Sequence, residues 1–237
     1  MRTKLHFERV LVLAPHADDA ELGCGGTMAR MVDEDVEVFI AVFSGAEDSL
    51  PSHVPRDRLR CEAAEATSAL GVPSANLFLY EHAVRKFPEV RQEILEAMVK
   101  LRRQVGPELV LTPSANDTHQ DHQVIYAESL RTFKDLSILG YELPWNHITF
   151  SAQAFNVLER RHIDRKWIPP RVYGEGLELD AVNVQKIGLA PIHCLRCTPP
   201  SQPDPDDLKG FRPLGLHLGS THFGQAIDEF CRKVETL

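Results

Sequence analysis

Two short stretches of the chain gather the residue types that hold a metal ion and activate water. The first is PHADDAEL, from Pro15 to Leu22, and the second is SANDTHQDH, from Ser114 to His122. A turn needs one Asp or Asn to bond its own backbone, or a glycine to take a positive φ. Three carboxylates and an imidazole in the first stretch exceed that need, so both stretches are candidates for chemistry.

The chemistry that these residue types favour is metal-assisted hydrolysis. One imidazole from each stretch and one carboxylate would form the mixed nitrogen and oxygen ligand set of a catalytic zinc, which keeps a fourth position open. Zinc lowers the pKa of a bound water from ~15.7 to about 7 and polarises a carbonyl oxygen. A carboxylate beside the ligands could take the proton of the water, and a second histidine could stabilise the oxyanion and protonate the leaving group.

The elements around these stretches predict where they meet. Apolar runs predict strands at Val10–Leu13, Val36–Ser44, Asn76–Tyr80 and Leu109–Thr112. Segments of helical spacing lie between the strands, which indicates an α/β fold of three layers, a mostly parallel, Rossmann-like sheet flanked by helices. Ligands of such sheets bind outside the carboxyl ends of the strands, and each of the two stretches follows a strand.

The glycines of GCGG are expected to let the backbone pass close to the metal site. They occupy Gly23, Gly25 and Gly26, and the first helix is expected to begin near Gly25. In that case Glu21 would lie before the helix and favour the positive end of its dipole.

The composition of the chain limits the kinds of partner that it is expected to bind. The net charge of −8 and the pI of about 5.8 argue against a nucleic-acid groove, which needs a basic face, and favour a small-molecule partner. An apolar fraction of 43% is enough for a core, and no run approaches the ~20 apolar residues of a membrane span. A cytoplasmic protein with five reduced cysteines is expected, and a homo-oligomer is compatible with the sequence.

The two stretches resemble the motifs of one family. The chain is similar to the PIG-L/LmbE-like zinc N-deacetylases, whose first motif is close to A-H-P-D-D-A-E-L-G-x-G-G and whose second ends in H-x-D-H. Here these motifs read PHADDAELGCGG and HQDH, and the resemblance runs from about Val10 to Lys166. It implies a zinc-dependent amidohydrolase that removes the acetyl group from an N-acetylated hexosamine or a related glycoside with metal-activated water.

The resemblance also implies roles for particular residues. His16 and Asp19 from the first motif and His122 from the second would bind one Zn²⁺ per chain, or another divalent metal. Asp18 would be the general base and His119 the electrophile and general acid. Asp121 would either fix the tautomer of His119 or serve only to cap the following helix.

The chain departs from the family pattern in two places. Ala17 replaces the usual proline, which removes no ligand. After Lys166 the family continues through a helix and a Tyr-x-Ser-Gln pattern, whereas this chain becomes proline-rich. We therefore expect a single deacetylase domain over 1–237, with a catalytic core over 1–166 and an atypical segment over 167–237 that reflects divergence or a shifted reading frame.

Two residues are weaker candidates for substrate contacts. Arg85 could bind a phosphate or carboxylate attached to the sugar, and Trp145 could stack on a sugar face or belong to the core.

Two other functions stay open. Paired aspartates could hold magnesium for phosphoryl transfer, although the histidines argue for zinc. A sugar-binding protein without catalysis could also retain this fold.

Overall fold

The computed structural model describes residues 7–149, 152, 154–166 and 192–196, the last of these as backbone. The atypical segment, apart from 192–196, lies outside these residues, so the prediction for it stays a prediction. A sheet of order β3-β2-β1-β4-β5-β6 forms the centre, and β1 to β5 run parallel while β6 is antiparallel to β5. The strands are β1 (Arg9–His16), β2 (Glu37–Ser44), β3 (Leu77–Leu79), β4 (Leu109–Pro113), β5 (Ser137–Tyr141) and β6 (Ile192–Arg196).

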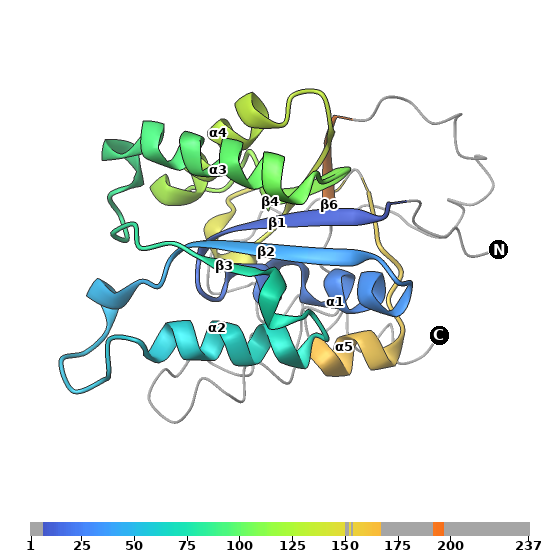
Figure 1. The fold of residues 1–237 in the computed structure, drawn as a ribbon, viewed down its shortest axis with the longest axis horizontal. Coiled ribbons are helices and arrows are strands. Elements are labelled where there is room, and N and C mark those ends of the chain that lie inside the picture. Colours follow the sequence, from blue (N-terminus) through green and yellow to red (C-terminus); the bar gives the residue numbers. More distant parts are fainter. Residues whose placement is uncertain (1–6, 150–151, 153, 167–191, 197–237) are drawn as a thin grey trace.

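Helices cover both faces of the sheet. Figure 1 shows α3 and α4 above the sheet and α1, α2 and α5 below it. The predicted three-layer α/β fold is therefore confirmed. The α-helices are α1 (Asp19–Asp33), α2 (Arg58–Ala69), α3 (Arg91–Val105), α4 (Gln120–Thr132) and α5 (Arg160–Lys166), and the short 3₁₀ turns are η1 (Glu47–Ser49), η2 (Ser74–Asn76), η3 (Phe87–Glu89) and η4 (Pro144–Asn146).

Each face of the sheet has its own apolar core. Side chains alternate along β1, so Val10 and Val12 pack toward α1 and α2, while Leu11 and Leu13 pack toward α3 and α4. All four are fully buried, as expected for a strand covered on both faces. Because β1 lies between β2 and β4 and is parallel to both, the carboxyl end of β1 lies beside that of β4.

Helix α1 begins earlier than the sequence suggests. It starts at Asp19 and contains the glycines, with a kink at Cys24 (φ −137°, ψ 19°). A Cβ at Gly23 would overlap the ring of Tyr141 of β5, and one at Gly26 would overlap the side chain of Leu158. The expectation that these glycines serve the metal site was wrong, because they allow α1 to pack closely against its neighbours.

Candidate metal centre

The first group of polar side chains stands where β1 passes into α1. His16 is the last residue of β1, Asp18 is the N-cap of α1, and Asp19 begins the helix. The backbone N–H of His16 donates to Oδ2 of Asp19 at 2.8 Å, which fixes the turn. The second group comes from the loop after β4 and the start of α4, where His119 is the N-cap and His122 lies in the first turn.

Three ligand atoms from these two groups form a tight triangle. Nδ1 of His16, Nε2 of His122 and Oδ2 of Asp19 lie 3.2 Å from one another along every side. Ligands of a tetrahedral zinc lie ~2.0–2.1 Å from the metal, so they are separated by ~3.3 Å. The triangle therefore has the size and the donor types that zinc requires. His119 also belongs to the cluster, since ligand atoms of the three histidines lie within 4.8 Å of one another.

Buried carboxylates hold the far side of both imidazoles. Nε2 of His16 lies 3.0 Å from Oδ2 of Asp121, and Nδ1 of His122 lies 2.7 Å from Oδ2 of Asp117. A carboxylate at the far nitrogen keeps the ring proton there and turns the lone pair of the near nitrogen toward the triangle. No role was expected for Asp117, although its place five residues before His122 is a signal for this contact.

The cluster is strongly negative apart from its imidazoles. Asp19, Asp117 and Asp121 are at most 5% exposed. Burial works to raise the pKa of Asp19, but the neighbouring imidazoles of His122 and His16 outweigh it and hold that pKa well below its usual range. Burial likewise works to lower the pKa of His122, but the charge of Asp19 and the hydrogen bond with Asp117 raise it to about 10. The buried carboxylates thus stabilise a positive charge in the space between them.

The two parts of Asp121 have different partners. Its carboxylate accepts from the backbone N–H of Arg85 (2.5 Å) and of Phe87 (3.3 Å), in addition to its contact with His16. Its backbone N–H donates to Nδ1 of His119 at 3.2 Å. The backbone, and not the carboxylate, therefore sets the tautomer of His119, whose ring proton lies on Nε2 when the ring is neutral. The carboxylate does not cap the helix, because that role belongs to His119.

Asp18 and His119 stand beside the triangle without being part of it. Asp18 makes no capping hydrogen bond with α1, although it occupies the N-cap position. Burial, followed by the adjacent charge of Asp19, raises the pKa of Asp18 to about 6. Burial, followed by His122 and His16, lowers the pKa of His119, whose ring centroid lies 4.9 Å from that of His16 and 4.7 Å from that of His122.

Comparison with known proteins shows which family contains this arrangement of residues. The family described as "PIG-L: GlcNAc-PI de-N-acetylase" matches residues 11–132, which contain every residue of the cluster. The chain belongs to the PIG-L family. It is 25% identical over 164 residues to the uncharacterized deacetylase YaiS of Escherichia coli (strain K12), a match that covers 66% of this chain and 85% of that protein.

Solved structures share the PIG-L fold. The N,N'-diacetylchitobiose deacetylase of Pyrococcus horikoshii superposes with a TM-score of 0.60 at 19% identity, over 81% of this chain and 84% of that chain. The 4-carboxy-2-hydroxymuconate hydratase GalB of Pseudomonas putida KT2440 superposes with a TM-score of 0.65 at 15% identity, over 83% of this chain and all of that chain. These likenesses show the fold, which hosts more than one reaction of water.

The other residues with an expected role, Glu21, Arg85 and Trp145, differ in their exposure and in how they connect to the cluster. Glu21 is buried inside α1, in its first turn, and not ahead of the helix as expected. Arg85 is exposed, and its backbone N–H reaches the cluster through Asp121. Trp145 is 53% exposed, so it is not a core residue. Its turn η4 adjoins the loop after β4, where the backbone N–H of Thr118 donates to the carbonyl of Asn146 at 3.0 Å.

Proposed function

We propose that this PIG-L protein is a zinc-dependent N-deacetylase that releases acetate from an N-acetylated hexosamine or a related glycoside. The observation that carries the proposal is the triangle of His16, Asp19 and His122, whose sides and donor types suit a tetrahedral zinc with one position free. Family membership and the deacetylases among its relatives support the reaction class.

The residues beside the triangle supply the proton transfers. When bound, zinc acidifies a water molecule and polarises the acetamide carbonyl. The carboxylate of Asp18 takes the proton from the attacking water, which is free to happen because this side chain makes no capping bond with α1. The oxygen of water bonds to the acetyl carbon, and the carbon–nitrogen bond then breaks to give acetate and a free amine.

His119 serves the other side of the reacting carbonyl. Its Nδ1 accepts from the backbone of Asp121, so Nε2 carries the ring proton and donates to the developing oxyanion. Because the backbone N–H of Asp121 occupies Nδ1 and burial lowers the pKa of His119, the general-acid role expected of His119 falls to Asp18, which passes the proton taken from water to the leaving nitrogen. In this proposal Asp121 and Asp117 are positioning residues, because each acts through a histidine of the triangle.

The proposal extends to partners and location. The partner is a small N-acetylated sugar, and Trp145 remains a candidate to stack on its face. No helix among the described residues is long and apolar enough to cross a membrane. We place the reaction in the cytoplasm, which agrees with free thiols at Cys24 and Cys61.

The test is acetate release from a panel of N-acetylglucosamine derivatives by protein of known metal content. Chelation should abolish release and zinc should restore it. Asp18→Asn should retain one zinc per chain and lose about 10²- to 10⁴-fold in turnover, the usual worth of a general base. Acetate release by chelated protein, or full turnover by zinc-loaded Asp18→Asn, would refute these assignments.

The same panel separates the other functions. Binding of an N-acetyl sugar with no acetate from any zinc-loaded sample would favour a sugar-binding protein without catalysis. Restoration of a phosphoryl-transfer activity by magnesium alone would favour the paired-aspartate alternative. Acetate must be measured directly, because a hydratase shares this fold.

A further inference from the structure

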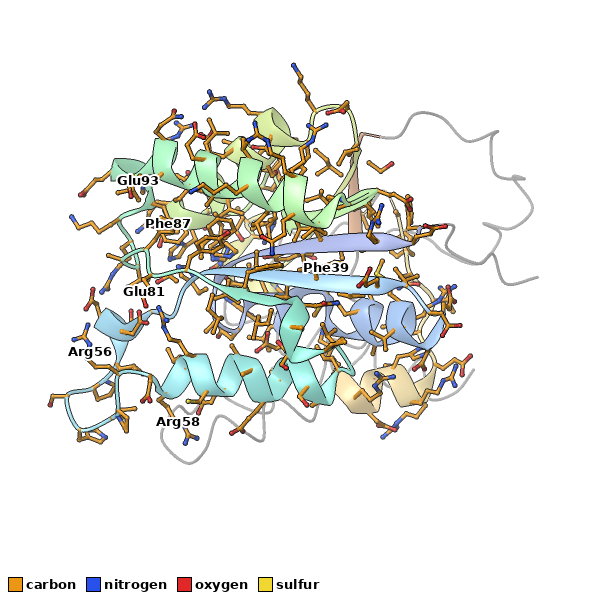
Figure 2. All side chains as sticks on the ribbon, in the orientation of Figure 1. Phe39, Arg56, Arg58, Glu81, Phe87 and Glu93 are labelled. Carbon is orange, nitrogen blue, oxygen red and sulfur yellow. The ribbon has the colours of Figure 1, made fainter. Side chains whose placement is uncertain are left out.

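Each histidine of the triangle is held through a buried carboxylate, and different segments of the chain hold the two carboxylates. In Figure 2 Phe87 lies at the left end of the sheet, and its ring centroid is 6.0 Å from that of His16. The N–H of Phe87 donates to Asp121, whose carboxylate contacts His16. The loop between β3 and α3 therefore supports His16. Other contacts surround Asp117, which orients His122.

The turn η4 is joined to the loop that carries Asp117. The backbone N–H and the hydroxyl of Thr118 both donate to the carbonyl of Asn146, at 3.0 and 2.9 Å. Asp117 itself forms an antiparallel bridge with His147, the residue that follows η4. The segment after β5 is therefore paired with the carboxylate residue that orients His122.

A chain of hydrogen bonds through Ser114 and His147 closes this junction. Nε2 of His147 lies 2.5 Å from Oγ of Ser114, and Nδ1 of His147 lies 2.8 Å from the carbonyl of Leu143. A carbonyl can only accept, so Nδ1 of the neutral ring carries the proton and Nε2 accepts from the Ser114 hydroxyl. The same hydroxyl oxygen accepts from the N–H of Asn116 at 3.3 Å. The polar atoms of both side chains are thus fixed by partners within the chain.

The backbones of this pair both contact Asp117. The carbonyl of Ser114 accepts from the N–H of Asp117 at 3.2 Å, and His147 contributes the bridge. A serine hydroxyl beside an imidazole is also the arrangement of an activated nucleophile. Ser114 is only 3% exposed, however, and offers almost no surface to a substrate. Burial and these contacts favour a supporting role.

We propose that Ser114 and His147 are positioning residues of the candidate metal centre, and that they act through Asp117. The inference rests on the proposed function, because it takes His122 as a metal ligand. Oδ2 of Asp117 lies 2.7 Å from Nδ1 of His122, and Oδ1 accepts from the N–H of His119 at 2.9 Å. A displaced Asp117 would turn the lone pair of His122 out of the triangle, which weakens metal binding.

The experiment measures zinc affinity by competition with a chelator of known affinity. Ser114→Ala removes the hydroxyl, His147→Phe keeps a ring without its nitrogens, and the double variant combines them. Both single changes are also made in the Asp117→Asn background. Thr118→Val is the matched control, because it removes a side-chain hydrogen bond to Asn146 between the same two segments at nearly constant size.

The expected losses are small and not additive. Each single variant should lower zinc affinity by about 3- to 10-fold, the worth of one ordinary hydrogen bond. The double variant should lose no more than about twofold beyond the larger single loss, because the pair works as one unit. In the Asp117→Asn background the same changes should alter affinity by less than about twofold, as should Thr118→Val alone. Full losses that multiply with that of Asp117→Asn would overturn the proposal. Ser114→Ala alone decides the matter if His147→Phe does not fold.

Proton NMR keeps this inference separate from the proposed function. In metal-free protein the Nδ1 proton of His122 should resonate downfield because of its hydrogen bond with Asp117, and loss of the signal in His122→Gln identifies it. Ser114→Ala and His147→Phe should shift or broaden this resonance, whereas Thr118→Val should not. If the unchanged protein binds no zinc or releases no acetate and the resonance still responds, the metal chemistry fails and the positioning stands. An unmoved resonance with unchanged zinc affinity refutes the positioning.

Discussion

Helix α4 carries buried carboxylates near both of its ends, and the two ends neutralise them in different ways. Near the carboxyl end, Glu128 is fully buried and pairs with Arg91 (2.5 Å) and Arg131 (2.7 Å), which are permanent cations. Near the amino end, the carboxylate of Asp121 contacts only backbone N–H groups and the imidazole of His16 among the residues that the structure describes. In the first arrangement, permanently charged side chains of the chain neutralise the carboxylate. In the second, neutralisation depends on an imidazole that can lose its proton.

This difference separates a structural charge cluster from the candidate metal centre. A buried carboxylate without a compensating charge is costly, and a fixed arginine removes that cost permanently. Imidazoles balance Asp19, Asp117 and Asp121 only while protonated, and a divalent cation can replace those protons. Converting a carboxylate to an amide in each cluster therefore tests the comparison, and we rank the variants by their expected effect on zinc affinity.

Asp19→Asn should have the largest effect. The change removes a charged oxygen from the triangle at almost constant size. Loss of an outer partner alone costs about 10- to 100-fold in metal affinity, so loss of a ligand should cost more than about 100-fold and abolish acetate release. Competition with a zinc chelator of known affinity measures the change, and circular dichroism should show an intact fold. Zinc affinity equal to that of the unchanged protein would remove Asp19 from the ligand set.

Asp117→Asn should have an intermediate effect. The carboxylate contacts Nδ1 of His122 and also accepts from the backbone N–H of His119 at 2.9 Å, so it orients one ligand and one proposed catalytic group. Zinc affinity should fall by about 10- to 100-fold, with residual activity at saturating zinc. The same chelator competition provides the readout. Unaltered affinity and turnover would mean that this carboxylate has no positioning role.

Glu128→Gln should leave zinc affinity unchanged and lower stability. The side chains of Arg91 and Arg131 are 51% and 60% exposed, so water can solvate them once the carboxylate is gone. We expect a loss of about 1–3 kcal/mol in the free energy of unfolding, measured in urea, which is the range for disrupting hydrogen bonds to a charged group. A fall in zinc affinity comparable to that of Asp117→Asn would erase the distinction between the two ends of α4.

The sequence is enough to predict that the two motifs lie together, because each motif directly follows a strand that the apolar pattern indicates. Apolar runs indicate β1 and β4, and parallel strands bring their carboxyl ends to one edge. Pairing of β1 with both β2 and β4 then places His16 beside His122 although 105 residues lie between them. The family motifs add the order of ligands, which composition and spacing alone leave open.

Contacts that depend on tertiary packing could not be predicted from the sequence. The carboxylate of Asp121 turns toward Arg85 and Phe87, and no local pattern signals a bond to a loop that lies between β3 and α3. The start of α1 was misplaced because glycine has a low helix propensity, whereas close packing against Tyr141 favours glycine at position 23. In both cases tertiary contacts outweighed the local preference.

The most direct test of the ligand assignment is anomalous diffraction at the zinc edge from crystals of zinc-loaded protein. The account predicts one peak, bonded to Nδ1 of His16, Oδ2 of Asp19 and Nε2 of His122, with His119 outside the coordination sphere. A peak bonded to His119 in place of Asp19, or no peak at this edge of the sheet, would contradict it.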